Sequence, residues 1–461
     1  MVRHRFIDGP PMRASRASDG RRARALVRAM RFDVLARDAR GVGARAGRLR
    51  DDRARAATPC ALAATSKGAP HALTDDVLAD VEARLRARAG DVDADGDGFG
   101  LAVCSAHARA DGGGVGKRKR EDGGGAGRAR GTRRRDAGRA AVGHYRDAIW
   151  HGLDLREGSK ELAVACESGC GRRWLTSREH AEGARELGAR AACALADERG
   201  GRESERRAMV RVERTMLMLE ETVREVRASG VELGILATLV GGESVAARER
   251  SSALTAEFIE REKARDVVVG YALGGFFAGE DASTRGACVE ASLKHVNARE
   301  DAFVYLPGST TVEDVIDNIE RGVDVFDASW ASETAARGRA FCFPVDDTDV
   351  TAIALAVEGR RTRATNGGDA YSLNLWAAAY KTDFTPFLPA ASCTCPACAE
   401  HTKAYVHHLL QSHEMTATVL LEAHNLFRWC AFFSAARRAI RAGTWRAFAA
   451  FHRAYASASR T

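Results

Sequence analysis

The chain has 461 residues, of which 45% are hydrophobic, and a formal net charge of +8. This length supports a large core in one or two domains. The sequence contains no run of eighteen apolar residues and no secretory signal near Met1, so we expect no transmembrane segment. Eleven cysteines in such a chain indicate reduced thiols and metal binding, not a disulfide framework, and a cytoplasmic location is expected.

The positive charge is concentrated in two segments. Residues 1–31 carry nine Arg and two Asp, and residues 105–142 carry eleven Lys or Arg against four acids, which gives +7 for each segment. The rest of the chain therefore carries −6. A polyanion would have to contact a local patch or one of these two segments.

Residues 1–30 are predicted to form a flexible basic arm. A transit peptide is the alternative, but Asp8 and Asp19 and the lack of a clear apolar face argue against it. Residues 105–142 contain almost no large apolar side chain, so we predict a disordered insertion that cannot enter a core. The cluster Lys117–Arg120 inside it is either a nuclear-import or RNA-contact element or a solvated loop, and we favour the loop.

Short β-rich runs alternate with helical stretches between residues 231 and 330. The runs predicted as strands are 233–240, 267–273, 303–306 and 323–326. Thr311 is predicted to cap the helix before the last strand, and Gly322 lies just past the end of that helix. The strand–helix–strand spacing implies parallel pairing, which both a (β/α)₈ barrel and a doubly wound sheet satisfy.

A dense cysteine cluster follows near the C-terminus. Cys393, Cys395 and Cys398 lie within six residues, and His424 follows 26 residues after the last of them. Three thiolates at this spacing converge easily on one tetrahedral ion, and Cys₃His is a closed structural set for Zn²⁺. One structural zinc ion is therefore predicted, held through helical segments that bring His424 back to the thiols. Ordinary buried thiols are the less favoured alternative.

These residues belong to a longer ordered pattern. It comprises Asn374–Asn425 with the cysteine cluster, Gly270–Glu280 with its paired glycines, and Gly322–Asp327. The pattern resembles the tRNA-guanine transglycosylases. The resemblance implies an α/β fold, a TIM (β/α)₈ barrel over residues 31–461 with a zinc-binding segment, 393–424, near the C-terminus.

The resemblance also implies roles for residues at the strand ends. Family members exchange guanine in tRNA through attack of an aspartate on the ribose, and Asp327 matches that nucleophile at the end of a predicted strand. Its alternative role is to cap the helical stretch 331–336. Asp197 matches a base-contacting aspartate, and Gly274 and Gly275 match substrate-binding glycines.

Other parts of the family's catalytic apparatus are missing. Catalytic members place a Cys and a Pro-Thr-Arg run after the aspartate, where this chain has Ala328–Arg337. Val240 stands where a base-binding glutamine is expected, and an apolar side chain cannot replace that hydrogen bond. The motif that supplies the family's second catalytic aspartate does not occur in the sequence.

The departures and the N-terminal half favour one branch of the family. Thr58–Thr74 and Arg211–Glu220 are similar to the accessory subunits of eukaryotic queuine tRNA-ribosyltransferase. The resemblance implies a non-catalytic subunit that pairs with a catalytic queuine tRNA-ribosyltransferase subunit and helps to hold tRNA while queuine replaces guanine at the wobble position. The same resemblance implies that the expected cytoplasmic protein is attached peripherally to the mitochondrial outer membrane.

Two other functions stay open at this point. The chain is an active transglycosylase that uses Asp327, or a zinc-stapled RNA-binding protein with no part in base exchange. For the accessory function, Tyr405, His408 and Leu409 are the candidates for the partner face, with packing on their own barrel as an equal alternative.

Overall fold

The computed structural model describes residues 30–38, 43–50, 55–66, 69–70, 72–89, 100–104, 141–144, 159–160, 162–168, 171–199, 201–230, 232–309, 311–349, 354 and 368–460. The predicted arm therefore lies outside the described residues up to position 29, and so do residues 105–140 of the predicted insertion. No helix in the described part of the chain is long and apolar enough to span a bilayer.

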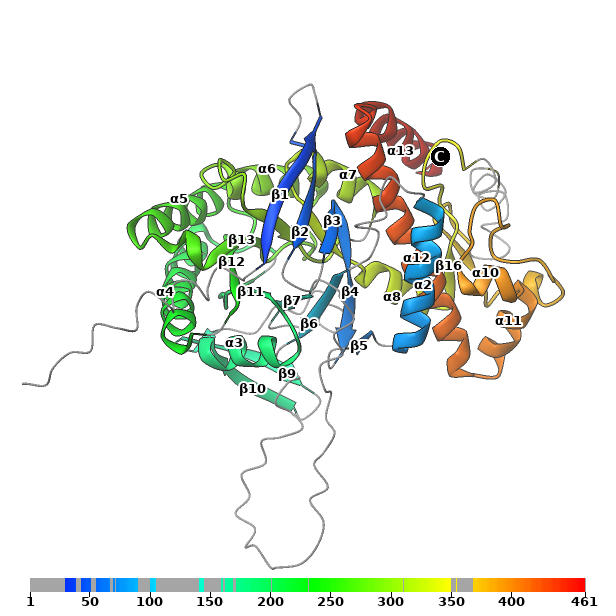
Figure 1. The fold of residues 1–461 in the computed structure, drawn as a ribbon, viewed down its shortest axis with the longest axis horizontal. Coiled ribbons are helices and arrows are strands. Elements are labelled where there is room, and N and C mark those ends of the chain that lie inside the picture. The colour runs from blue at the N-terminus through cyan, green and yellow to red at the C-terminus, as the bar shows by residue number, and fades with distance from the viewer. Residues whose placement is uncertain are drawn as a thin grey trace, which may run out of the picture.

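Eight parallel strands close into a barrel at the centre of the molecule (Figure 1). In hydrogen-bonding order they are β4 (Cys60–Ser66), β6 (Gly100–Cys104), β7 (Ala141–His144), β11 (Ala191–Cys193), β12 (Gly234–Leu239), β13 (Val268–Leu273), β14 (Phe303–Leu306) and β15 (Val325–Asp327). The last strand pairs with the first, with Val325 opposite Cys60 and Asp327 opposite Leu62. This closure confirms the TIM barrel and excludes the doubly wound sheet, which would leave two open edges.

Helices form the outer layer. They are α2 (Asp75–Ala89), α3 (Ser177–Glu186), α4 (Glu205–Ser229), α5 (Val245–Arg261), α6 (Ala282–Leu293), α7 (Val312–Glu320) and α8 (Ser329–Ala336), with a 3₁₀ turn η4 (Ala264–Asp266). The predicted cap of α7 is confirmed, because the Thr311 side chain accepts a hydrogen bond from the Asp314 amide. Gly322 follows the helix with a φ of 96°, a conformation that favours glycine.

Two predicted boundaries need correction. Strand β15 begins at Val325, two residues later than predicted. Ala141 and Val142, the last residues of the predicted insertion, lie in strand β7, where Val142 is buried and pairs with both neighbouring strands. The first error arises because Val323 is buried and apolar although it precedes the strand, and the second because Gly and Arg neighbours hide a short strand whose burial comes from the closed barrel.

Two three-stranded antiparallel sheets and a short edge strand accompany the barrel. The first sheet comprises β1 (Arg31–Arg37), β2 (Arg45–Arg50) and β3 (Arg55–Thr58), and the second comprises β8 (Ser159–Lys160), β9 (Ala163–Ser168) and β10 (Gly171–Thr176), while β5 (Ala69–Pro70) pairs with β4. Phe32 and Leu49 of the first sheet are buried in the same cluster as the residues inside the barrel. The first sheet therefore covers the end of the barrel at which β4 begins.

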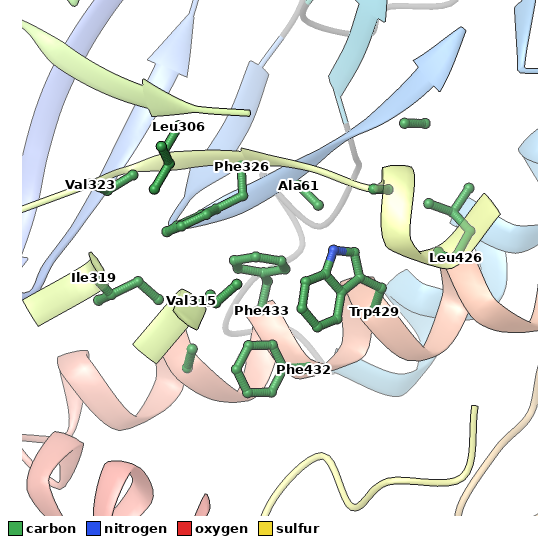
Figure 2. Packing of buried hydrophobic residues seen from close by; sticks show 14 of the residues in the cluster. Ala61, Leu306, Val315, Ile319, Val323, Phe326, Leu426, Trp429, Phe432 and Phe433 are labelled. Carbon is green, nitrogen blue, oxygen red and sulfur yellow. The ribbon is translucent and has the colours of Figure 1, made fainter. Parts of the chain in front are cut away.

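The C-terminal segment packs on the barrel side where α7 and α8 lie. Its elements are β16 (Arg339–Phe341), β17 (Ser372–Asn374), η5 (Ala378–Tyr380), α10 (Pro396–Glu400), α11 (Lys403–Gln411), α12 (Met415–Arg441) and α13 (Trp445–Arg460). Figure 2 shows Phe433 of α12 facing Phe326 of β15, with Trp429 and Phe432 of the same helix packed around Phe433. This burial of large aromatic side chains ties α12 to the barrel wall.

Candidate functional site

The four predicted metal ligands come together from two helices. Cys393 precedes α10, Cys395 is its N-cap residue and Cys398 lies within it. The Cys398 amide donates a hydrogen bond to the Cys395 sulfur at 3.3 Å, which shapes the loop around the thiols. His424 is on α12, and the four ligand atoms lie within 4.8 Å of one another.

The donor geometry fits a tetrahedral metal ion. The His424 Nδ1 atom lies 3.7, 3.3 and 3.3 Å from the sulfurs of Cys393, Cys395 and Cys398. Metal–sulfur bonds of about 2.3 Å and metal–nitrogen bonds of about 2.0 Å in a tetrahedron would place these atoms about 3.5 Å apart. All four residues are buried. The described residues therefore contain a closed cluster that can hold a metal ion and leaves no position for substrate.

Surrounding groups orient the histidine. The other ring nitrogen of His424, Nε2, lies 2.8 Å from the Phe341 carbonyl oxygen, so it donates this hydrogen bond and Nδ1 faces the thiols. Burial opposes a charge on this ring, but the thiolates of Cys398 and Cys393 raise the pKa of His424 to about 10. The centre of the cluster thus attracts a cation.

Asp327 lies at the C-terminal end of β15, as predicted, but its carboxylate is enclosed. The side chain is fully buried. The Gly308 amide donates to Oδ2 at 2.7 Å, and the Ser329 amide donates to Oδ1 at 3.1 Å, where the Ser329 hydroxyl also donates. Burial raises the pKa of Asp327, and these hydrogen bonds oppose the rise. The carboxylate binds Ser329, the first residue of α8. This contact is close to the alternative role predicted for Asp327, which was to cap the helical stretch 331–336.

Asp197 follows β11 at the same end of the barrel. Its two carboxylate oxygens accept hydrogen bonds from Arg211 at 2.5 Å and Arg214 at 3.1 Å. Both arginines are on α4, and Asp197 itself is buried. The predicted base-contacting carboxylate is therefore held by two positive charges from its own chain.

The paired glycines after β13 also use their backbone groups within the chain. The Arg248 guanidinium, fully buried on α5, donates to the Gly274 carbonyl at 2.7 Å. The Gly275 amide donates to Glu198 at 3.2 Å. Burial raises the pKa of Glu198 to about 7 against the opposing effects of this amide and of Arg248. Val240, in place of the expected glutamine, is buried among the apolar residues inside the barrel.

Sequence reasoning missed the arginines in this arrangement. Arg211 and Arg214 are three residues apart on one helix and so share a face, a signal that was available before the structure. Arg248 gave no such signal, because its partners are backbone carbonyls from two different strand ends.

The closed (β/α)₈ barrel and the Cys₃His cluster near its C-terminus define a transglycosylase-type barrel. The family described as queuine tRNA-ribosyltransferase matches residues 151–457, and the chain belongs to this family. Among curated relatives, the queuine tRNA-ribosyltransferase accessory subunit 2 of Culex quinquefasciatus is 32% identical over 246 residues, which are 52% of this chain and 52% of that protein.

The same subunit from two vertebrates is also similar. The protein of Xenopus laevis is 28% identical over 268 residues, covering 54% of this chain and 62% of the relative. The human protein is 28% identical over 250 residues, covering 50% of this chain and 57% of the relative. The chain thus spans about half the length of the curated relatives it matches.

Proposed function

We propose that this chain is the non-catalytic subunit of a heterodimeric queuine tRNA-ribosyltransferase, bearing one structural zinc ion and acting in the cytoplasm. It pairs with a catalytic homologue and supports the exchange of guanine for queuine at the wobble position of tRNA. One observation carries the proposal: the two carboxylates at the C-terminal end of the barrel, Asp327 and Asp197, are both enclosed by groups of the chain itself.

The enclosure matters because base exchange needs accessible carboxylates. A nucleophile has to reach the ribose carbon, and a base-binding carboxylate has to offer its lone pairs to the purine edge. Asp327 is fully buried, and both oxygens of Asp197 accept from arginines of α4. The segment that supplies those arginines, Arg211–Glu220, is also the one that resembles accessory subunits.

The region around the metal cluster, residues 374–425, offers a surface for the partner, and we call it the metal-bearing segment. Among the described residues, four of the exposed large apolar side chains fall within it: Trp376, Phe384, Tyr405 and Met415. Phe384 is 76% exposed, and its loop is hydrogen-bonded to the first turn of α11, which carries Tyr405. Of the two other residues predicted for the partner face, His408 is exposed. Leu409 is buried in the chain's own core, which corrects its assignment to that face. Solvent-exposed aromatic side chains of this kind are typical of subunit contacts.

Base exchange tests the proposal directly. Labelled guanine should enter tRNA when the chain is mixed with its catalytic homologue and should not enter when the chain is supplied alone. Exchange by the chain alone would establish the active-enzyme alternative. If the homologue alone gave full exchange and formed no stable complex with this chain, the alternative of an RNA-binding protein with no part in base exchange would be supported.

The partner surface is tested by charge insertion. Phe384→Asp and Tyr405→Asp should each weaken the heterodimer, because an aspartate would be buried without a partner at the contact. Leu217→Asp is the matched control, since Leu217 is 54% exposed on α4, outside the metal-bearing segment. The measurement is the size of the co-expressed pair by light scattering. An intact heterodimer in both variants would remove this surface from the contact.

A further inference from the structure

Phe384 is the most exposed aromatic residue in the described part of the chain. It is 76% exposed, against 44% for Trp174, which comes next. A phenylalanine ring offers a large apolar surface and no polar group, so its exposure to water is unfavourable. Single exposed apolar residues are common, and Phe384 differs from them in how firmly its loop is held.

The backbone on both sides of Phe384 is fixed to the first turn of α11. The Ala404 amide donates to the Asp383 carbonyl at 2.8 Å, and the Lys403 amide donates to the Thr385 carbonyl at 2.9 Å. The residue before Phe384 and the residue after it are therefore each hydrogen-bonded to this helix.

Lys403 joins the same two residues through its side chain. Its Nζ atom donates to the Asp383 carboxylate at 3.0 Å and to the Thr385 hydroxyl at 2.8 Å. The amide and hydroxyl of Thr385 both donate to the other oxygen of that carboxylate, at 3.0 and 2.5 Å. Burial would raise the pKa of Asp383, but the hydrogen bonds from Thr385 and the hydrogen bond and charge of Lys403 lower it. The carboxylate is thereby kept in its charged form.

The lysine is itself enclosed. Lys403 is 8% exposed, and its Nζ atom lies 6.0 Å from the centre of the Tyr380 ring. A lysine has much side-chain entropy to lose, and it is rarely buried without a specific partner. Both acceptors of this lysine flank Phe384, so the element that the buried lysine orders is the loop that carries the exposed ring.

A second aromatic side chain extends the same surface. Tyr405 follows Lys403 by two residues and is exposed. Figure 1 shows α11 at the edge of the molecule, outside the barrel and α12. Exposed polar residues next to these aromatic residues in sequence include Lys381 and Glu400. Aromatic side chains at the centre with polar residues around them are the typical composition of a protein contact.

We propose that Phe384 is the anchor side chain of the contact with the catalytic homologue, and that Lys403 is a positioning residue that holds Phe384 in its binding conformation. Only the identity of the partner rests on the proposed function. Each loop or side chain that has to be ordered at a contact weakens association, and a loop that is fixed beforehand avoids this cost. Aromatic anchors typically fill a pocket of the other protein. The catalytic homologue should accordingly offer an apolar pocket for a phenyl ring.

The test measures the affinity of the full-length chain for its catalytic homologue by titration calorimetry. Phe384→Ala should weaken binding about 30-fold, as expected for an anchor side chain. Lys403→Met keeps the apolar stem and removes the N–H donors, and it should weaken binding about tenfold, since the loop must then be ordered on association. Lys294→Met is the matched control, because this lysine is ion-paired with Glu249 outside the metal-bearing segment. The control should bind as the wild type does.

The double variant separates positioning from a general effect on folding. If Lys403 acts through the Phe384 ring, Lys403→Met should add little to Phe384→Ala, so the combined loss stays near about 30-fold, whereas independent effects would multiply to about 300-fold. Thr385→Val tests the same link in a second way, because it removes the hydroxyl between Lys403 and Asp383 and keeps the backbone hydrogen bonds. This variant should weaken binding about threefold. Zinc content and thermal unfolding show that each variant is folded.

Four outcomes would overturn the proposal. They are wild-type affinity in Phe384→Ala, wild-type affinity in both Lys403→Met and Thr385→Val, multiplied losses in the double variant, and an equal loss in Lys294→Met. In these four outcomes the wild type still binds its homologue, so the proposed function is left standing. A wild-type chain that does not bind its homologue at all would overturn the proposed function together with this contact.

Discussion

At the scale of single residues, the carboxylate of Asp327 is held inside the fold. Asp327 accepts three hydrogen bonds within the chain, from Gly308 and from the amide and hydroxyl of Ser329. A carboxylate fixed in this way joins the ends of β14, β15 and α8. These contacts give Asp327 a structural role in the fold.

Asp327→Asn should therefore cost stability and spare base exchange. The amide keeps the size of the side chain but leaves one buried N–H without an acceptor, so the free energy of unfolding should fall by about 1–3 kcal/mol. Exchange per assembled heterodimer should stay near the wild-type rate, whereas loss of an essential nucleophile usually costs at least about 10⁴-fold. An abolished rate in a fully assembled heterodimer would contradict the proposed function.

Glu198 gives a prediction about pH. Its folded-state pKa of about 7 is raised above the ordinary value of 4.5, so the unfolded chain loses this proton first as the pH rises. The free energy of unfolding should consequently fall between about pH 4.5 and 7, by about 3 kcal/mol at most for this group. Urea unfolding at pH 5 and pH 8 should show a smaller difference for Glu198→Gln than for the wild type or the exposed control Glu213→Gln. Equal differences in all three proteins would contradict the assignment.

At the scale of elements, α12 couples the metal cluster to the barrel. Besides His424, this helix carries Asn425, whose side chain donates to the Ala331 carbonyl at 3.2 Å and accepts from the Phe341 amide at 2.8 Å. Trp429 donates to the Asp327 carbonyl at 3.2 Å. Asn425 and Trp429, which follow His424, thus hold α12 against β15 and α8. The position of His424 in the cluster therefore sets how α12 lies along the barrel wall.

Removing a metal ligand should for this reason destabilise the barrel as well as the C-terminal segment. Cys395→Ala and His424→Ala should lose zinc and lower the free energy of unfolding by more than about 3 kcal/mol, since structural metal binding contributes directly to folding. Cys430→Ala is the matched control, a half-buried cysteine on the same helix outside the cluster. Zinc content and thermal unfolding give the measurement. Stoichiometric zinc in both ligand variants would refute the cluster.

At the scale of the whole molecule, the sequence predicted features that depend on local patterns. It did not predict features that depend on closure of the barrel. The strand 303–306, the Thr311 cap and the Cys₃His set depend on neighbours in sequence, and the structure reproduces all three. Strand β11, Ala191–Cys193, was not predicted, because three small residues show no strand pattern in the sequence. They are identified as a strand only by their pairing with the two flanking strands. The enclosure of Asp197 depends on how α4 packs, which is likewise a property of the assembled fold.

The pairing of β6 with β7 sets a limit on the segment between them. The two strands are parallel neighbours, with Leu101 opposite Ala141 and Val103 opposite Gly143. The chain must therefore return from the end of one strand to the beginning of the next, and such a crossover needs about a dozen residues or more. The expectation that no part of residues 105–142 enters a core is corrected by the burial of Val142.

Two variants separate the crossover from the insertion. Deleting 105–142 should abolish folding, because it removes both the crossover and two residues of β7. Replacing 105–140 by a Gly/Ser linker of about 16 residues should keep the barrel and its zinc, since that length is sufficient for the return. Circular dichroism, thermal unfolding and zinc content provide the comparison. A folded deletion variant would contradict the parallel pairing, whereas an unfolded linker variant would show that the replaced residues themselves stabilise the barrel.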